Sequence, residues 1–250
     1  ILTENGCRWK RKRDKILTPL ARYFLFPFID GFVAITPAAR KFLEANGAKD
    51  VRVIGNPINV KLFYPQKRIG ERENVVLFVG RLHPIKGITF LLLAMKELTH
   101  EIPDIRLLIV GGGPLEPIVR KLSKKYDFIH YLGPKPGEEL PKYYNTAKVF
   151  VLPSIHEPFG TVLAEAMACG TPVVGSNIEG ILHVIGDAGI LVAPRDYKAI
   201  KKAVKKIIKD EDLAETLSRK GRKRVEKLFS YEAVAEKYEI LFHDILTEAA

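Results

Sequence analysis

Short apolar runs alternate along the chain with longer segments in which apolar residues recur every three or four positions. The short runs predict buried strands at Phe32–Ile35, Val51–Ile54, Val75–Val79, Arg106–Val110, Phe128–Leu132, Val149–Leu152, Pro172–Val174 and Ile190–Val192. The longer segments predict helices at Pro37–Asn46, Ile88–Leu98, Pro114–Tyr126, Leu140–Thr146, Phe159–Ala168 and Tyr197–Lys209. Because strands that alternate with helices need crossover connections, we expect an α/β fold with a doubly wound parallel sheet.

The pattern also divides the chain. Residues 56–74 combine proline and glycine with scattered charges, which is typical of a linker. Residues 75–209 supply enough strands for one doubly wound sheet, whereas residues 1–55 supply too few for a core of their own. Because the chain begins at Ile1 rather than Met, we expect residues 1–55 to be the remnant of an N-terminal domain that is mostly missing. Residues 210–250 are expected to be helices that reach back across the linker.

Composition restricts the class of protein. With 47% hydrophobic and 28% charged residues, the chain is typical of a soluble globular protein, and no apolar run approaches the roughly 20 residues that span a bilayer. Cys7 and Cys169 are the only cysteines, which excludes a disulfide framework and favours the cytoplasm. A single glutamine beside abundant Lys, Glu and Ile is typical of a thermophile protein.

A net charge of +11 raises the question of a nucleic-acid or membrane partner. The lysines of the predicted helix Tyr197–Lys209 are expected largely on its solvated face, and no nucleic-acid-binding motif occurs, so no specific nucleic-acid partner is predicted. A second basic cluster, Arg8–Lys15, precedes apolar residues that continue to Phe26. Residues 8–30 therefore predict either a peripheral contact with the inner face of a membrane, or a basic loop followed by a core helix.

Doubly wound sheets bind ligands at the carboxyl ends of their strands. After Val79 come Gly80, Arg81 and Lys86, so that two cations lie five residues apart before a predicted helix. A planar guanidinium and a mobile ammonium at such a place indicate a phosphate-binding loop. After Val110 comes a run of three glycines, which suits either a tight turn or a backbone that approaches a ligand closely.

Two carboxylates follow the predicted strand Val149–Leu152. Glu157 precedes the next helix, and Glu165 lies within it among apolar residues, where a carboxylate should have a partner. The backbone N–H groups around Gly160 belong to the first turn, where donors are unpaired and suit a diphosphate. Carboxylates beside such donors suit the hydroxyl groups of a sugar.

The order Gly80-Arg81-x4-Lys86-Gly87, Gly111-x-Gly113-Pro114 and Glu157-x7-Glu165 resembles the donor-binding half of the retaining glycosyltransferases of family 4, also called glycosyl transferases group 1. The resemblance, which covers roughly residues 32–238, implies a Rossmann-like donor domain of a GT-B fold. It implies a retaining hexosyltransferase that uses a nucleoside-diphosphate sugar, needs neither cofactor nor metal, and serves a saccharide or lipid-linked acceptor in polysaccharide biosynthesis. The alternatives are a sugar-nucleotide-binding module that is inactive by itself and a module that binds an anionic membrane surface.

The same resemblance assigns roles to residues. It implies catalytic roles for Arg81, Lys86 and Glu157, the two cations against the diphosphate and Glu157 against the sugar hydroxyls. It implies donor-binding roles for Gly80, Gly111, Gly113, Gly133, Phe159, Gly160, Thr161 and Glu165, the last against the ribose. Two positions depart from the family pattern, because Glu179 stands where a glycine is usual and His183 where a glutamate is usual. Both are expected near the donor sugar.

Three other classes of protein are compatible with parts of this pattern. A carboxylate pair is found in glycoside hydrolases, although the neighbouring cations argue against that class. Sugar-nucleotide epimerases and phosphorylases share the fold, but the cations together with both carboxylates favour transfer from a nucleotide donor.

Overall fold

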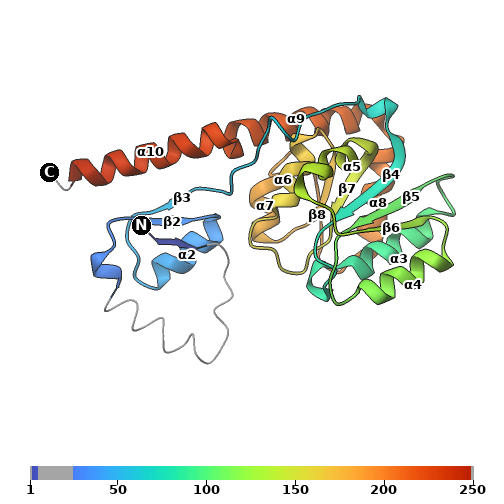
Figure 1. The fold of residues 1–250 in the computed structure, drawn as a ribbon, viewed down its shortest axis with the longest axis horizontal. Helices are drawn as coiled ribbons and strands as arrows, with labels where there is room; N and C mark the ends of the chain where they lie inside the picture. Colours follow the sequence, from blue (N-terminus) through green and yellow to red (C-terminus); the bar gives the residue numbers. More distant parts are fainter. Residues whose placement is uncertain (1, 5–24, 249–250) are drawn as a thin grey trace.

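The structure is a computed structural model that describes residues 2–4 and 25–248 (Figure 1). They form two parallel sheets, one of three strands in the order β1-β2-β3 and one of six in the order β6-β5-β4-β7-β8-β9. The strands are β1 (Leu2–Glu4), β2 (Phe32–Ala34), β3 (Val51–Val53), β4 (Glu73–Val79), β5 (Arg106–Val110), β6 (Ile129–Gly133), β7 (Ala147–Leu152), β8 (Val173–Ser176) and β9 (Ile190–Val192). The α-helices are α2 (Pro37–Ala45), α3 (Ile88–Leu98), α4 (Glu116–Lys125), α5 (Leu140–Thr146), α6 (Thr161–Ala168), α7 (Glu179–Ile185), α8 (Tyr197–Lys209), α9 (Glu211–Phe229) and α10 (Tyr231–Glu248).

The six-stranded sheet is doubly wound, as the sequence predicts. Its first strand, β4, lies in the middle, with β5 and β6 on one side and β7, β8 and β9 on the other. Helix α3 packs against α8 on one face, and α6 packs against α5, α7 and α9 on the other (Figure 1). The direction of winding therefore reverses between β4 and β7, which is where doubly wound sheets form their ligand crevice.

The predicted elements of this sheet are confirmed, with differences at their ends. Helix α4 begins at Glu116 rather than Pro114, because Pro117 occupies its first turn while Pro114 lies in the turn that follows the glycines. Strand β1 and helix α7 were not predicted. Residues 8–24 of the expected membrane-contacting segment lie outside the described residues, and Phe26–Phe28 forms a turn of 3-10 helix. In the described part of the chain, no helix is long and apolar enough to cross a membrane.

The core of the six-stranded sheet explains why its strands are apolar at consecutive positions. Val76, Leu77 and Phe78 of β4 are all fully buried, as are Val149, Phe150 and Val151 of β7. Both faces of the sheet are covered by helices, so neighbouring side chains on a strand point into separate apolar layers. This packing fixes the ends of β4 and β7, from which the candidate site is built.

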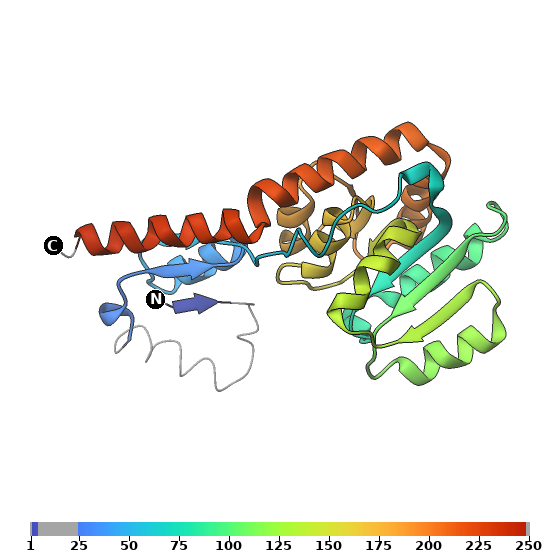
Figure 2. The ribbon, with the colours of Figure 1, turned by 45° about the horizontal axis from the view of Figure 1, so that its top comes forward.

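The three-stranded sheet is covered by helices from opposite ends of the chain. Helix α2 packs on one face, where Phe32, Leu43 and Val51 share a buried cluster. Helix α10 supplies Val234 and Leu241 to a second cluster with Val33 and Ile54. Figure 2 shows α10 running along this sheet, while α9 lies over the six-stranded sheet. The last helices of the chain thus connect both sheets.

Two buried or half-buried arginines hold the segment between the sheets in place. Arg72 donates hydrogen bonds to the carbonyl oxygens of Lys67, Tyr144, Ala147 and Cys169 and to the hydroxyl of Thr171. Arg222 of α9 donates to the carbonyl oxygens of Val60, Phe63 and Ala168. Each guanidinium therefore donates hydrogen bonds to several backbone carbonyl groups, which a linker without regular structure would otherwise leave without a donor.

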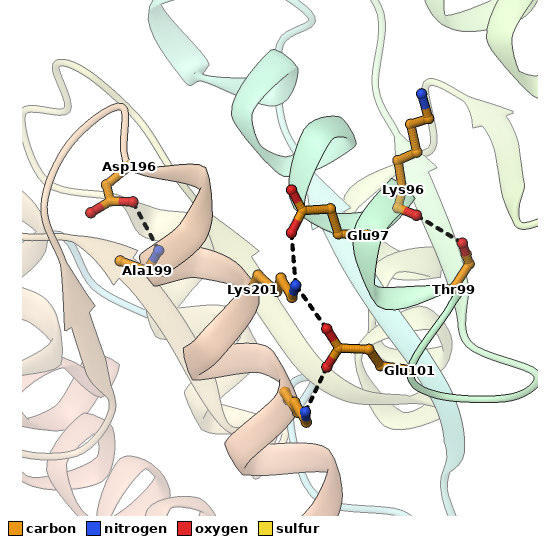
Figure 3. Close-up of polar contacts among 8 residues, drawn as sticks. Lys96, Glu97, Thr99, Glu101, Asp196, Ala199 and Lys201 are labelled. Carbon is orange, nitrogen blue, oxygen red and sulfur yellow. Dashed lines mark hydrogen bonds and ion pairs between the residues drawn. The ribbon is translucent and has the colours of Figure 1, made fainter.

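The lysines of α8 lie largely on a solvated face, as the sequence predicts, but Lys201 and Lys205 are half-buried. Lys201 lies between Glu97 and Glu101 of α3, with Nζ–Oε distances of 2.7 Å to each, and Lys205 also pairs with Glu101 (Figure 3). Hydrogen bonds from the two lysines lower the pKa of Glu101 to about 2. Part of the positive charge is therefore neutralised between helices that cover the same face of the sheet.

Candidate functional site

The loops that leave β4 and β7 are in direct contact at the point where the winding reverses. The amide of Ile155 donates to the carbonyl oxygen of Ile85 at 2.8 Å. Gly87 has a φ of +70°, and a Cβ at this position would lie 1.9 Å from the carbonyl oxygen of Pro153. Only glycine permits both the left-handed backbone and this close approach. Gly87 therefore lets the loop that carries Lys86 lie against the loop that carries Glu157.

Lys86 and Glu157 form an ion pair at this contact. Their Nζ and Oε2 atoms lie 2.5 Å apart, and the side chains are 23% and 9% exposed. The hydroxyl of Ser154 donates to the same Oε2 atom at 3.3 Å. The sequence assigns the two charged residues to different parts of a ligand, whereas the structure shows that each is also the other's partner. Ser154 was not predicted, since one serine in a loop carries no distinctive signal.

Arg81 is exposed at the start of the same loop. It forms no ion pair or side-chain hydrogen bond with any residue in the described ranges. The next turn is held by His83, whose Nδ1 accepts a hydrogen bond from the amide of Ile85 at 3.2 Å. The guanidinium therefore remains available to an anion beside a loop whose backbone is fixed.

Glycines form the adjoining surface at the ends of β4, β5 and β6. The amide of Gly80 donates to Val110, and the amide of Gly111 donates to Gly133. A Cβ on Gly111 would lie 2.0 Å from the carbonyl oxygen of Gly80, and one on Gly113 would lie 2.7 Å from that of Leu82. The structure thus brings the predicted glycines together as a strip of bare backbone, and these loops cannot pack this way with larger residues.

Helix α6 begins after the loop that carries Glu157, and it has no side-chain cap. Its N-cap is Gly160, with a φ of +92°, and the hydroxyl of Thr161 accepts a hydrogen bond from Asn56 Nδ2 at 3.3 Å. The first-turn amides of α6 are therefore not occupied by a capping side chain. The side chain of Phe159 is buried and packs edge-to-face on Phe229, so this residue could contact a ligand only through its backbone.

Glu165 lies on α6 apart from the ion pair, and its partner is Tyr144 of α5. The fully buried phenol donates a hydrogen bond of 2.8 Å to Glu165 Oε2, which confirms that this carboxylate has a partner. Burial raises the pKa of Glu165 to about 6, although the hydrogen bond from Tyr144 opposes that rise. Tyr144 was not recognised from the sequence, because a tyrosine in an amphipathic helix is usually a core residue.

A cavity of about 500 Å³ lies between the small N-terminal unit and these loops. One wall comes from residues 35–36, which follow β2, and from α2, and the other comes from residues 155–158 and 178–180. The lining residues are Ile35, Thr36, Ala38, Ala39, Phe42, Ile155, His156, Glu157, Pro158, Ile178, Glu179 and Gly180. A larger cavity of about 780 Å³ lies between residues 65–71 and α9, and it contains none of the predicted site residues.

The two positions that depart from the family pattern lie in different surroundings. Glu179 lines the cavity, at the first residue of α7. The ring of His183, one turn later, instead packs against Phe159 and Phe229, and burial lowers its pKa. Both residues are expected near a ligand. Glu179 lines a cavity in which a ligand could bind, whereas His183 belongs to an aromatic cluster. Among residues 2–4 and 25–248, no three His, Cys, Asp or Glu side chains are grouped as metal ligands would be.

Comparison with known protein families finds a match over most of this region. The family model described as "Glycosyl transferases group 1" matches residues 61–224, which include β4 to β9 and every predicted site residue. The chain is 33% identical over 184 residues to a capsular polysaccharide biosynthesis glycosyltransferase of Staphylococcus aureus, an alignment that covers 70% of this chain and 47% of that protein. The chain spans about half the length of the curated relatives it matches.

Solved structures agree with the fold. A sucrose-phosphate synthase from Thermosynechococcus elongatus aligns with a TM-score of 0.80 and 32% identity, over 99% of this chain and 68% of that one. An Anabaena protein crystallised with UDP aligns with a TM-score of 0.84 and 19% identity, over 97% of this chain and 71% of that one. The second match, at its low identity, concerns the fold alone.

Proposed function

Because the chain belongs to the glycosyl transferases group 1, we propose that it binds a nucleoside-diphosphate sugar where its six-stranded sheet reverses winding. The binding would serve a retaining, metal-independent hexosyltransferase of family 4. The observation that carries the proposal is the contact between Lys86 and Glu157. There, at the strand ends, a cation suited to a diphosphate meets a carboxylate suited to sugar hydroxyls. A ligand that carries both a diphosphate and a sugar could contact the two residues at once.

The diphosphate is assigned to Arg81, Lys86 and the first turn of α6. Arg81 is free of ion pairs with described residues. Lys86 can contact a phosphate oxygen either in place of Glu157 or in addition to it. Both cations would stabilise the charge that develops on the leaving nucleoside diphosphate, a role that metal ions take in other enzymes. The bare amides around Gly160 and Thr161 add donors on the same side.

The remaining parts of the donor are assigned to the two carboxylates and the glycine strip. Glu157 would accept hydrogen bonds from sugar hydroxyls through Oε1, since Oε2 is held by Lys86 and Ser154. Glu165 would accept from the ribose, with Tyr144 holding its Oε2 atom. The backbone at Gly80, Gly111 and Gly113 permits close approach, and the base would lie near Gly133.

The structure argues against the hydrolase alternative. A glycoside hydrolase needs a carboxylic acid that carries a proton and a second carboxylate free to attack or to activate water. Glu157 is instead ion-paired with Lys86, and Glu165 accepts a hydrogen bond from a buried phenol on another helix. The raised pKa of Glu165 would suit a general acid, but Glu157 is held through Oε2 by Lys86 and Ser154 and is therefore less suited to attack or to activate water. As a pair, the two carboxylates suit hydroxyl recognition better than hydrolysis.

A second candidate function is binding of the sugar nucleotide without transfer. The observation that favours it is that every candidate site residue lies within the region matched by the family model and is assigned to the donor, while none is assigned to a saccharide or lipid-linked acceptor. Activity assays of the 250-residue chain, with hydrolysis and transfer measured separately, distinguish binding alone from catalysis.

Calorimetric titration with UDP-, GDP- and ADP-sugars tests the donor proposal. We expect one of the three classes to bind, and Arg81→Ala and Lys86→Ala to weaken it about tenfold to a hundredfold, the range for lost charge-assisted hydrogen bonds. Lys202→Ala is the matched control, because Lys202 is an exposed cation of α8 far along the chain from the site. Folded protein that binds none of the three classes would contradict the proposal.

A further inference from the structure

The lining of the cavity beside the candidate site contains acidic residues but no lysine or arginine. Of its twelve lining residues, Glu157 and Glu179 are the only ones with a formal charge at neutral pH when His156 is neutral, and none is Lys or Arg. Glu157 is neutralised by Lys86. Glu179 has no ion pair and no side-chain hydrogen bond with any residue that the structure describes. One uncompensated negative charge therefore lies on this wall.

The backbone fixes where that charge lies. A Cβ on Gly180 would be 2.1 Å from the carbonyl oxygen of Glu157 and 2.6 Å from that of Pro158. The start of α7 is therefore in close backbone contact with the loop that carries Glu157. Glu179 is the first residue of that helix, and it lines the same wall of the cavity as Glu157.

The crevice is consequently polarised. Arg81 and Lys86 follow β4, whereas Glu157 and Glu179 follow β7 and β8, the next strands across the sheet. A ligand whose phosphates meet the cations places the group attached to those phosphates toward the carboxylates. In the donor proposed above, that group is the sugar.

We propose that Glu179 is a specificity-determining residue that makes this site select uncharged hexosyl donors over uronosyl donors. The inference rests on the proposed function. A sugar carboxylate on this wall would lie near the exposed and uncompensated carboxylate of Glu179, and like charges a few ångströms apart repel each other even where solvent screens them. A neutral sugar meets no such repulsion and can donate hydroxyl hydrogen bonds to the same carboxylate.

A purely structural role for Glu179 would have a different signature. An acidic residue in the first turn of a helix is favoured by the helix dipole wherever the helix lies. Loss of that effect would lower stability but would not change the relative affinity for two ligands. The ratio of affinities for a hexosyl and a uronosyl donor therefore separates the two roles.

The experiment measures that ratio by calorimetry on the full chain. The probes are UDP, UDP-glucose and UDP-glucuronate, or the matching hexose and uronate of the base identified by the donor screen. We expect wild type to bind the hexosyl probe about tenfold tighter than the uronosyl probe, and Glu179→Gln to reduce the ratio to about twofold by tightening the uronosyl probe. Glu211→Gln, at the exposed first residue of α9, is the matched control and should leave the ratio unchanged.

Salt provides an independent readout. If repulsion by Glu179 causes the discrimination, raising NaCl to about 0.5 M should reduce the wild-type ratio and leave that of Glu179→Gln unaltered. A ratio near one in wild type, or an unchanged ratio in Glu179→Gln, overturns the role of Glu179 while the bare nucleoside diphosphate still binds. Loss of all nucleotide binding in folded wild type overturns the donor proposal itself, and this inference with it.

Discussion

Glu165 is a residue whose surroundings determine its protonation near neutral pH. It lies on α6 in an apolar layer, and Tyr144 of the neighbouring helix α5 donates a hydrogen bond to its carboxylate. Burial raises its pKa to about 6, so it is ionised at pH 7 but takes up a proton only slightly below that. If it accepts hydrogen bonds from a ribose, its ionised form is the better acceptor.

We therefore expect donor affinity to fall as the pH is lowered from 7 to 5 in wild type, and to be lower but flat over that range in Glu165→Gln. A sugar nucleotide is the right probe, because its diphosphate, esterified at both ends, has no ionisation near pH 6, unlike a terminal phosphate. Tyr144→Phe removes a hydrogen bond that lowers the pKa of Glu165, so the midpoint should move upward. Calorimetry at half-unit pH intervals measures all three curves.

The same shift has a consequence for stability with a definite sign. Because the pKa in the folded state, about 6, lies above the ordinary 4.5, the native protein binds the proton first. The contribution of Glu165 to stability falls as the pH rises from 4.5 to 6 and stays at its lowest value above that. Glu165→Gln should thus be at least as stable as wild type at pH 7, by up to about 2 kcal/mol, as urea denaturation will show. Unfolding of this variant would contradict its role as a ligand contact.

Single residues also mark what the sequence could and could not reveal. Glycines after strands and charged residues in fixed order predicted the strand-end loops, since those positions depend on local backbone chemistry. The partners Tyr144 and Ser154 depend on which helix or loop lies opposite, and no local signal specifies that. The contact between His183 and Phe229 is not specified locally either, because Phe229 lies far along the chain.

At the scale of elements, Arg72 determines how the linker meets the six-stranded sheet. Its guanidinium reaches the linker itself, the ends of α5 and α6, and Thr171 before β8. Burial lowers its pKa to about 10, which still leaves it charged at neutral pH. The buried charge is balanced by oriented carbonyl dipoles rather than by a carboxylate among its hydrogen-bond partners.

Arg72→Met should accordingly be strongly destabilising, by roughly 3–5 kcal/mol, since it leaves several buried acceptors without a donor. Guanidinium denaturation monitored by circular dichroism gives the free energy of unfolding. Arg68→Met is the control, because Arg68 is exposed on the same linker and its hydrogen bonds with Glu71 are made by its backbone amide and carbonyl groups. A change below about 1 kcal/mol in Arg72→Met would show that the buried network is dispensable.

The alternation of strands and helices was predicted well because it reflects local periodicity, and the pairing between distant helices was not. The solvated lysine face expected for α8 is an example, since Lys201 lies between two glutamates of α3 (Figure 3). The helical spacing identifies which residues share a face. It does not identify which neighbouring helix that face meets.

At the scale of the whole molecule, the chain crosses between its two sheets twice in one place. The amide of Ile58 in the first crossing donates to the carbonyl oxygen of Phe229, where α9 gives way to α10. Beyond this point α10 supplies Val234 and Leu241 to the three-stranded sheet. The small sheet therefore depends on the C-terminal helix for one of its two apolar layers.

Removal of residues 231–250 should affect the two sheets unequally. We expect amides of β2 and β3 to lose protection from hydrogen exchange, because Val33 and Ile54 become exposed, while amides of β4 and β7 keep theirs. Hydrogen exchange read by mass spectrometry resolves the two regions. Equal loss of protection in both sheets would show that the molecule unfolds as one cooperative unit.

The cluster of Val33, Ile54, Val234 and Leu241 also has a consequence for biosynthesis. Translation proceeds from the N-terminus, so Val33 and Ile54 leave the ribosome long before their partners exist. The six strands from β4 to β9 are complete by Val192, and this sheet can form while α10 is still being made. The order of synthesis and the order of folding are therefore opposite at the two ends, and the strands that are made first acquire their apolar cover last.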